Sequence, residues 1–182
     1  MGRPDRESPP RLGVSACLLG HEVRFDGGHK RDRVITDLLG EFVVWVPICP
    51  EVEVGMGVPR PALRLVRDGD EVRMLEVESG RDHTRRMNRF ALRRVRALRQ
   101  LDLSGYVLKK GSPSCGMEGV QVLEAEGSTR CEGRGLFASA LVEAYPRLPI
   151  EEEDRLGDPE LRESFIERVL AYRRLGNASP TT

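Results

Sequence analysis

The chain has 182 residues, of which 32% are charged and 39% are hydrophobic, and its 29 basic and 29 acidic side chains give a formal net charge of zero. This length suits one domain with its own core, and the balanced charge excludes a strong net field over the whole molecule. No apolar run approaches the roughly 18 residues of a membrane span, and the first residues contain no apolar segment of signal-peptide length, so we expect a cytoplasmic protein with reduced thiols.

The first half of the chain predicts strands separated by loops and one short helix. Residues 1–10 are polar and rich in proline, and we expect a flexible lead-in there. The apolar run 11–17 predicts a first strand, and residues 42–49 are apolar throughout, as in a strand buried on both faces. Residues 31–39 predict a short helix between the two strands. The loops that we expect are 18–30 and 50–62.

The second half continues the alternation. Residues 63–77 contain two strand-like runs around an Asp-Gly pair, which predicts a hairpin. Apolar residues three or four apart predict a helix over 82–101, and residues 105–110 predict another strand. Two more helices are expected, at 135–146 and 158–174, and an Asp and a Pro mark the start of the second. This order predicts the α/β class: a single Rossmann-like domain with a mainly parallel sheet flanked by helices, and a short C-terminal helical extension.

Two segments concentrate charge of one sign. Segment 81–99 holds eight arginines and one acid, Asp82, and residues 151–154 read EEED. We expect both segments to form solvated surface. Two other interpretations of the arginines stay open, since they could contact RNA phosphates or pair with the acidic run.

Three of the four cysteines occupy equivalent places. Cys17 and Cys49 end predicted strands, and Cys115 follows a third strand after a tight turn. Because the carboxyl ends of parallel strands share one edge, the three thiols should meet in one crevice. Three thiols favour a soft or borderline metal, either zinc or an iron–sulfur cluster with one iron left open, although each cysteine alone is more often a small buried hydrophobic residue. Cys131 lies in a polar segment that we interpret as a loop with no preceding strand, and we assign it no metal role.

Two polar residues accompany these cysteines. Glu51 stands two residues after Cys49, and Ser112 stands three residues before Cys115. Beside a metal centre, a carboxylate can act as a general base toward water, and a hydroxyl can relay a proton. The alternative is local: Glu51 would accept main-chain N–H groups of its own loop, and Ser112 would cap its turn. Two glycine-rich loops form either ordinary turns or an anion site, and the side chains that they offer are Arg24, Asp26, His29, Lys30 and Arg60.

A family resemblance rests on five segments in this order: VSACLLG, VRFDGGHK, PICPEVEVGMGVPRP, SGRDHT and YVLKKGSPSCG. Together they resemble the signature segments of the thiouracil desulfidase (TudS-like) family, from about residue 11 to about residue 146. The resemblance implies a [4Fe-4S] cluster with one open iron and three ligands, Cys17, Cys49 and Cys115. It also implies catalytic roles for Glu51 and Ser112, and a thiolated pyrimidine substrate whose sulfur leaves as sulfide without net redox change.

The glycine-rich loop and the C-terminal third resemble more closely the N-terminal domain of a two-domain branch, which is associated with removing sulfur from 4-thiouridine in tRNA. We therefore expect a desulfidase domain at 11–150 and a C-terminal helical extension at 151–182, which resembles the junction to a second domain. The partner that this implies is a thiolated pyrimidine base, nucleotide or tRNA. Two alternatives from other classes are a non-catalytic iron–sulfur or zinc redox sensor and an RNA-binding module.

Overall fold

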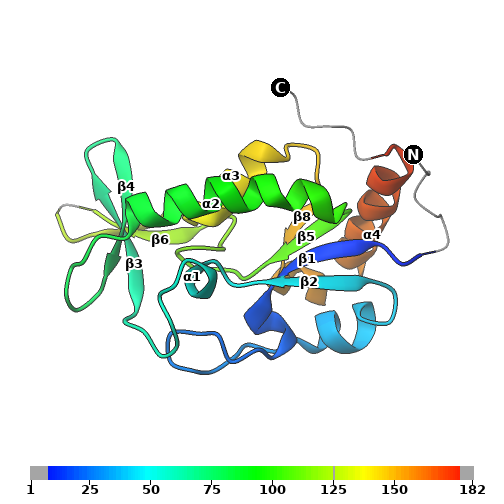
Figure 1. Cartoon of the computed structure of the whole chain (residues 1–182), viewed down its shortest axis with the longest axis horizontal. Coiled ribbons are helices and arrows are strands. Elements are labelled where there is room, and N and C mark those ends of the chain that lie inside the picture. The colour runs from blue at the N-terminus through cyan, green and yellow to red at the C-terminus, as the bar shows by residue number, and fades with distance from the viewer. Residues whose placement is uncertain (1–7, 125, 177–182) are drawn as a thin grey trace.

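The computed structural model describes residues 8–124 and 126–176, which form two four-stranded β-sheets covered by helices (Figure 1). Most of the expected lead-in at 1–10 lies outside the described residues. Helix α2 (Thr84–Leu98) extends along both sheets and shares one hydrophobic core with them. Within the described part, no helix is both long and apolar enough to cross a membrane.

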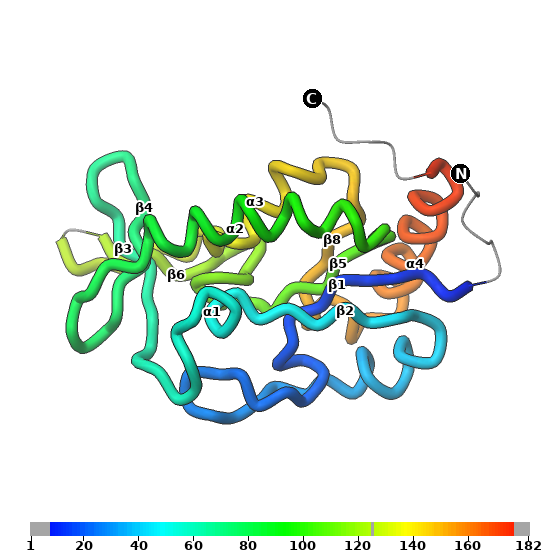
Figure 2. Tube along the Cα trace, in the orientation of Figure 1, coloured from blue at the N-terminus to red at the C-terminus, as the bar shows by residue number. Residues whose placement is uncertain are grey.

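The first sheet is parallel, and its strands are β1 (Arg11–Ser15), β2 (Val44–Ile48), β5 (Gly105–Leu108) and β8 (Ile150–Glu152). Their order is β2-β1-β5-β8, so strands from distant parts of the sequence lie side by side (Figure 2). The predicted α/β fold with a parallel sheet is confirmed. The expectation that residues 42–49 are buried on both faces is wrong, because β2 is an edge strand with Val44 and Pro47 exposed. Proline is tolerated at such an edge.

The second sheet joins two hairpins. Strands β3 (Leu63–Asp68) and β4 (Glu71–Glu76) form the predicted hairpin, and β3 pairs in parallel with β6 (Val120–Leu123), which continues into β7 (Thr129–Gly133). The hairpin of β6 and β7 was not predicted, because such short strands carry little periodic pattern. Cys131 lies exposed on β7, opposite Gln121, so its interpretation as a loop residue with no preceding strand is wrong.

The helices largely follow the predicted pattern. Helix α3 spans Leu136–Ala144, α4 spans Pro159–Arg174, and the carboxylate of Asp158 caps α4 by accepting two main-chain N–H groups, as its sequence predicts. The predicted helix at 31–39 is a π-helix, and part of the expected loop at 50–62 is helical. The shorter helices are η1 (Ala16–Leu19), η2 (Val34–Leu39), α1 (Pro50–Glu53), η3 (Arg99–Leu101) and η4 (Glu153–Gly157).

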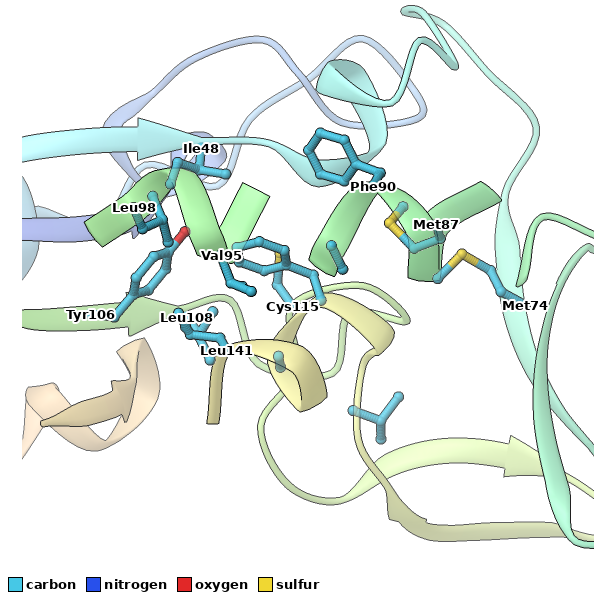
Figure 3. Packing of buried hydrophobic residues seen from close by; sticks show 14 of the residues in the cluster. Ile48, Met74, Met87, Phe90, Val95, Leu98, Tyr106, Leu108, Cys115 and Leu141 are labelled. Carbon is cyan, nitrogen blue, oxygen red and sulfur yellow. The ribbon is translucent and has the colours of Figure 1, made fainter. Parts of the chain in front are cut away.

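Two hydrophobic clusters lie on the two faces of the parallel sheet. The first lies beneath α2 and α3, where Val95, Leu98 and Tyr106 pack together (Figure 3). The second contains Val14 and Val107 on one side and Phe165 and Val169 of α4 on the other. Helix α4 therefore contributes to the hydrophobic core of this sheet. The boundary that we expected at residue 150, between the desulfidase domain and the C-terminal extension, falls at the first residue of β8.

The acidic run at 151–154 is largely buried. Glu151, Glu152 and Glu153 are only 6%, 5% and 9% exposed. Two arginines of the following helices bind the carboxylate of Glu151 at 2.8 and 2.9 Å, and the ammonium group of Lys109 binds that of Glu153. The expectation of a solvated surface is therefore wrong for these three glutamates. Strand β8 pairs with β5 and carries Glu151 and Glu152 into the fold, and Glu153 follows directly at the start of η4.

The arginines of segment 81–99 lie mostly on the exposed face of α2. Among the described residues, none of them forms an ion pair with the acidic run, which overturns that interpretation. Arg94 instead binds Glu53 at 2.8 Å, and Arg86 donates to the carbonyl oxygen of Val54 at 2.7 Å. These contacts attach α2 to the short helix α1, which directly follows Cys49.

Candidate active site

The structure brings Cys17, Cys49 and Cys115 to one cavity of about 330 Å³. Cys17 lies in η1 directly after β1, Cys49 directly follows β2, and Cys115 lies in the loop after β5. Since β2, β1 and β5 are parallel neighbours, their carboxyl ends meet at the same edge of the sheet. Cys131 lies on β7 and does not line this cavity.

Burial raises the pKa values of all three cavity thiols. Burial raises the pKa of Cys17 to about 11, and the neighbouring Cys49 adds to this increase. Burial also raises the pKa of Cys49 and raises that of Cys115 well above its usual range. Lys109 and Arg24 act in the opposite direction on Cys17. Deprotonated, these thiols would repel one another strongly, and binding to a positively charged centre is what relieves such repulsion.

Cys115 is held in a hydrogen-bonded turn. The Oγ atom of Ser112 accepts the main-chain N–H of Ser114 at 3.2 Å and that of Cys115 at 3.1 Å. The carbonyl oxygen of Ser112 accepts the N–H of Gly116 at 2.8 Å. Ser112 therefore caps this turn, as its local interpretation predicts, while it also lines the cavity.

The amino-terminal residues of α3 donate main-chain hydrogen bonds to this turn. The N–H of Leu136 donates to the carbonyl of Pro113, and the N–H of Phe137 donates to that of Ser114. The close approach requires glycine at position 135, since a Cβ atom there would lie 2.4 Å from the carbonyl carbon of Ser114. The turn and the first residues of α3 thus satisfy each other's main-chain groups.

Glu51 lies in α1 and reaches the cavity with a carboxylate that has two side-chain partners. Its Oε1 atom accepts a hydrogen bond from Oγ of Ser114 at 2.7 Å. Its Oε2 atom lies 2.8 Å from Nε and 2.7 Å from a terminal nitrogen of Arg60. The carboxylate is thus held by side chains from two other segments of the chain. The guanidinium group of Arg60, for which an anion site was one of two open interpretations, binds the carboxylate of Glu51.

Sequence reasoning missed Ser114 entirely. The motif Ser-Pro-Ser-Cys contains two hydroxyls, and only the fold shows that the second one contacts Glu51. For His29 the structure favours the ordinary turn over the anion site, because this residue does not line the cavity and its Nδ1 atom accepts the N–H of Arg31. The side chain of Asp26 likewise folds back onto its own loop. The charged side chains that line the cavity are mostly basic: apart from the acidic Glu51 they are Arg24, Lys30, Arg60, Lys109 and Lys110.

The sequence was compared with models of known protein families. Residues 12–153, most of the chain, match the family described as 2-thiouracil desulfurase.

The chain belongs to the 2-thiouracil desulfurase family.

Two relatives show how much of the chain this family covers. The uncharacterized protein YbbK of Bacillus subtilis (strain 168) is 31% identical over 145 residues, which are 77% of this chain and 95% of YbbK. The solved structure of the [4Fe-4S]-dependent thiouracil desulfidase TudS is 33% identical and superposes with a TM-score of 0.67. That match covers 87% of this chain and 99% of TudS. The resemblance found in the sequence is therefore confirmed at the level of family and fold.

The residues that line the cavity of this family member fit an iron–sulfur cluster. Thiolate sulfur is the donor that such clusters require, and three thiols line the same cavity. Burial, the largest effect, raises the pKa of Cys17, and the positive charges of Lys109 and Arg24 offset part of this increase. Among residues 8–124 and 126–176, no three His, Cys, Asp or Glu side chains are grouped as ligands of a single metal ion.

Proposed function

We propose that this chain is a [4Fe-4S]-dependent desulfidase that removes sulfur from thiolated pyrimidines. In this proposal Cys17, Cys49 and Cys115 are the three protein ligands, and one iron has no protein ligand. The observation that carries the proposal is that the three thiols line the same cavity as Glu51 and Ser112. Membership of the 2-thiouracil desulfurase family supports it, as does the likeness to TudS.

The overall reaction is a hydrolysis. A thiocarbonyl carbon exchanges its double bond to sulfur for one to the oxygen of water, and both protons of water leave with the sulfur as hydrogen sulfide. No electrons are gained or lost, so the reaction needs a Lewis acid, a base and a proton donor but no external reductant. In this proposal, residues of the cavity supply the base and the proton donor.

Glu51 is the candidate general base. When bound, the cluster would supply a Lewis-acidic iron for the substrate's sulfur. The carboxylate of Glu51 would accept a proton from the attacking water. Its side chain is only 13% exposed, so bulk water has little access to it. A base in this environment retains a defined orientation toward the cavity.

Ser112 is the candidate proton relay. Its oxygen accepts the N–H groups of Ser114 and Cys115, which fixes the oxygen on the cavity wall. The hydroxyl hydrogen is not used in these two contacts, so it can be donated into the cavity. We propose that this hydrogen bond assists the departing sulfur or orients the attacking water.

The substrate is a thiolated pyrimidine as a base, as a nucleotide or as 4-thiouridine in tRNA. Of the basic side chains that line the cavity, only Lys30 forms no ion pair among the described residues, and its ammonium group supports binding of a phosphate-bearing substrate. The exposed arginines of α2 support contact with RNA phosphates. We also propose a cytoplasmic location and a desulfidase domain at 11–150 with an extension at 151–182.

The decisive experiment is anaerobic purification and cluster reconstitution, followed by iron and sulfide analysis. The loaded protein is then incubated with 2-thiouracil, 4-thiouridine monophosphate and thiolated tRNA, and the loss of thiocarbonyl absorbance and the release of sulfide are measured. We expect four irons per chain and turnover of at least one substrate. A protein that holds the cluster yet leaves all three substrates unchanged would be a sensor, and the proposal would be wrong.

A further inference from the structure

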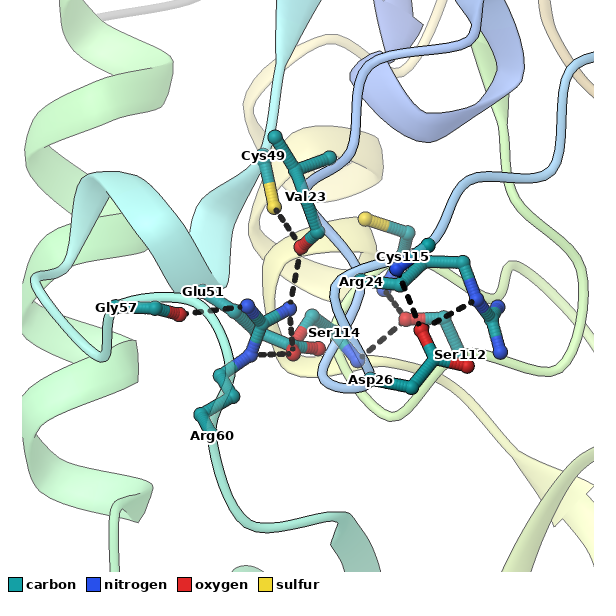
Figure 4. Close-up of polar contacts among 11 residues, drawn as sticks. Val23, Arg24, Asp26, Cys49, Glu51, Gly57, Arg60, Ser112, Ser114 and Cys115 are labelled. Atoms are coloured by element: carbon teal, nitrogen blue, oxygen red, sulfur yellow. Dashed lines mark hydrogen bonds and ion pairs between the residues drawn. The ribbon is translucent and has the colours of Figure 1, made fainter.

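The two oxygens of the Glu51 carboxylate are held by two residues from different segments of the chain. Ser114 lies after β5 and donates to Oε1 at 2.7 Å, whereas Arg60 lies before β3 and binds Oε2 through two nitrogens at 2.8 and 2.7 Å (Figure 4). Both partners are buried: Ser114 is 0% exposed, and the side chain of Arg60 is 4% exposed. Buried hydrogen bonds to a charged group are stronger than exposed ones.

Arg60 itself donates hydrogen bonds to three main-chain carbonyl groups. Its guanidinium group donates to the carbonyl oxygen of Gly57 at 2.9 Å and to that of Val23 at 2.8 Å. Its main-chain N–H donates to the carbonyl of Phe25 at 2.9 Å. The guanidinium is a rigid plane, so these contacts leave little freedom in its orientation toward Glu51. Arg60 thus connects the carboxylate to the loop at 23–25, which lines the same cavity.

Ser114 is anchored through its main chain. Its N–H donates to Oγ of Ser112, and its carbonyl oxygen accepts the N–H groups of Phe137 and Ala138 in α3. These contacts fix the backbone of Ser114 and leave its hydroxyl free to donate to Glu51. The two serines of the turn therefore have different tasks: the oxygen of Ser112 accepts from the turn, and the hydroxyl of Ser114 donates to the carboxylate.

We propose that Arg60 and Ser114 are positioning residues that fix the Glu51 carboxylate for proton transfer. This inference rests on the proposed function, in which Glu51 is the general base. Each residue binds one oxygen, and together they set the plane of the carboxylate. Arg60 uses both lone pairs of Oε2 and Ser114 uses one of Oε1, so the remaining lone pair, on Oε1, keeps one direction. A misplacement of about 1 Å in such a group lowers a rate by about 100-fold.

The test compares Arg60→Lys and Ser114→Ala, each in the wild-type and in the Glu51→Gln background. Lysine keeps the charge but loses the two-nitrogen contact, and alanine removes a single oxygen. We expect both single variants to retain iron, sulfide and visible absorbance while kcat falls by about 10- to 100-fold and KM changes by less than about 2-fold. In the Glu51→Gln background neither substitution should lower kcat further, because both residues act through the carboxylate.

Arg86→Gln is the matched control. Arg86 also holds the segment after α1, through the carbonyl of Val54 at 2.7 Å, but it does not contact Glu51. With 2-thiouracil as the substrate, which has no phosphate for the arginines of α2 to contact, we expect the kcat of this variant to stay within about 2-fold of wild type.

The outcomes separate this inference from the proposed function. Unchanged kcat in Arg60→Lys and Ser114→Ala would overturn the inference, and so would a further loss in the Glu51→Gln background. Loss of iron from Arg60→Lys would also count against it, because Arg60 would then hold the loops at the cluster rather than the carboxylate. Full activity of Glu51→Gln alone would instead remove Glu51 as the base and overturn the proposed mechanism.

Discussion

Oγ of Ser112 accepts the main-chain N–H of Cys115 at 3.1 Å, so a candidate catalytic hydroxyl and a candidate cluster ligand belong to one hydrogen-bonded turn. Removing the hydroxyl leaves the N–H groups of Ser114 and Cys115 without this acceptor. A substitution at Ser112 therefore acts on both the proton relay and the ligand. Activity expressed per bound iron separates the two effects.

Replacing any one of the three cavity cysteines by serine should abolish cluster binding and activity together. A cluster that has only three protein ligands cannot lose one without becoming labile. The variants are Cys17→Ser, Cys49→Ser and Cys115→Ser, and iron and sulfide analysis after anaerobic reconstitution measures the result. Cys131→Ser is the control and should behave as wild type, since this residue is exposed on β7. Full iron content in any cavity variant would remove that residue from the ligand set.

Glu51→Gln and Ser112→Ala should retain visible cluster absorbance and lose activity. Glutamine keeps the size of the side chain but cannot accept a proton, so kcat per iron should fall by about 100- to 10,000-fold. Ser112→Ala should lose a similar amount per iron, with a lower iron content because its turn has lost an acceptor. Anaerobic turnover normalised to iron measures both. Activity of Ser112→Ala equal to wild type per iron would leave this residue only its role in the turn.

Gly135→Ala should disturb the loop that carries Cys115. A Cβ atom at this position would lie 2.4 Å from the carbonyl carbon of Ser114, so the turn must shift away from α3. We expect iron content to fall by at least about half, because ligand geometry at a metal site tolerates only small displacements. Gly157→Ala is the matched control, since nothing lies within 4 Å of its added Cβ. Equal iron content in both variants would show that the turn adapts.

Phe165→Ala should destabilise the whole domain. Phe165 of α4 is fully buried between the parallel sheet and its helices, so its removal leaves a large cavity. The free energy of unfolding should fall by about 3–5 kcal/mol, as measured from urea midpoints at constant slope. Leu175→Ala, at a position that is 83% exposed, should change it by less than about 0.5 kcal/mol. A small effect of Phe165→Ala would indicate that α4 unfolds independently.

Glu76 should contribute to stability above acid pH. Hydrogen bonds from Ser79 and then from His83 lower the pKa of its carboxyl below the ordinary value of 4.5. A lowered folded-state pKa means that the stabilisation is present above the ordinary pKa and is lost as pH falls through the folded-state pKa. The thermal midpoint should therefore fall less steeply below about pH 5 in Glu76→Gln than in wild type. Glu22→Gln, on an exposed loop, should keep the wild-type slope.

Several features followed from local sequence alone. The apolar spacing of α2 predicted its buried face, and the Asp-Gly pair predicted the hairpin of β3 and β4. The grouping of Cys17, Cys49 and Cys115 was also predictable, because each follows a strand and parallel neighbours end at one edge. These inferences depend on contacts within a segment or on a general rule of sheet topology.

Only the tertiary structure decided the rest. The four-residue strand β6 and the three-residue strand β8 carry too little pattern to be predicted, and the burial of Glu151 depends on β8 pairing with β5 and on arginines that follow it. Whether Ser112 or Ser114 contacts Glu51 depends on the orientation of a turn that α3 supports from a distant part of the chain. Composition and spacing show which polar side chains the sequence contains. A hydrogen bond, however, requires that its donor and acceptor atoms lie within about 3 Å of each other. Packing between segments that are far apart in the sequence sets that distance.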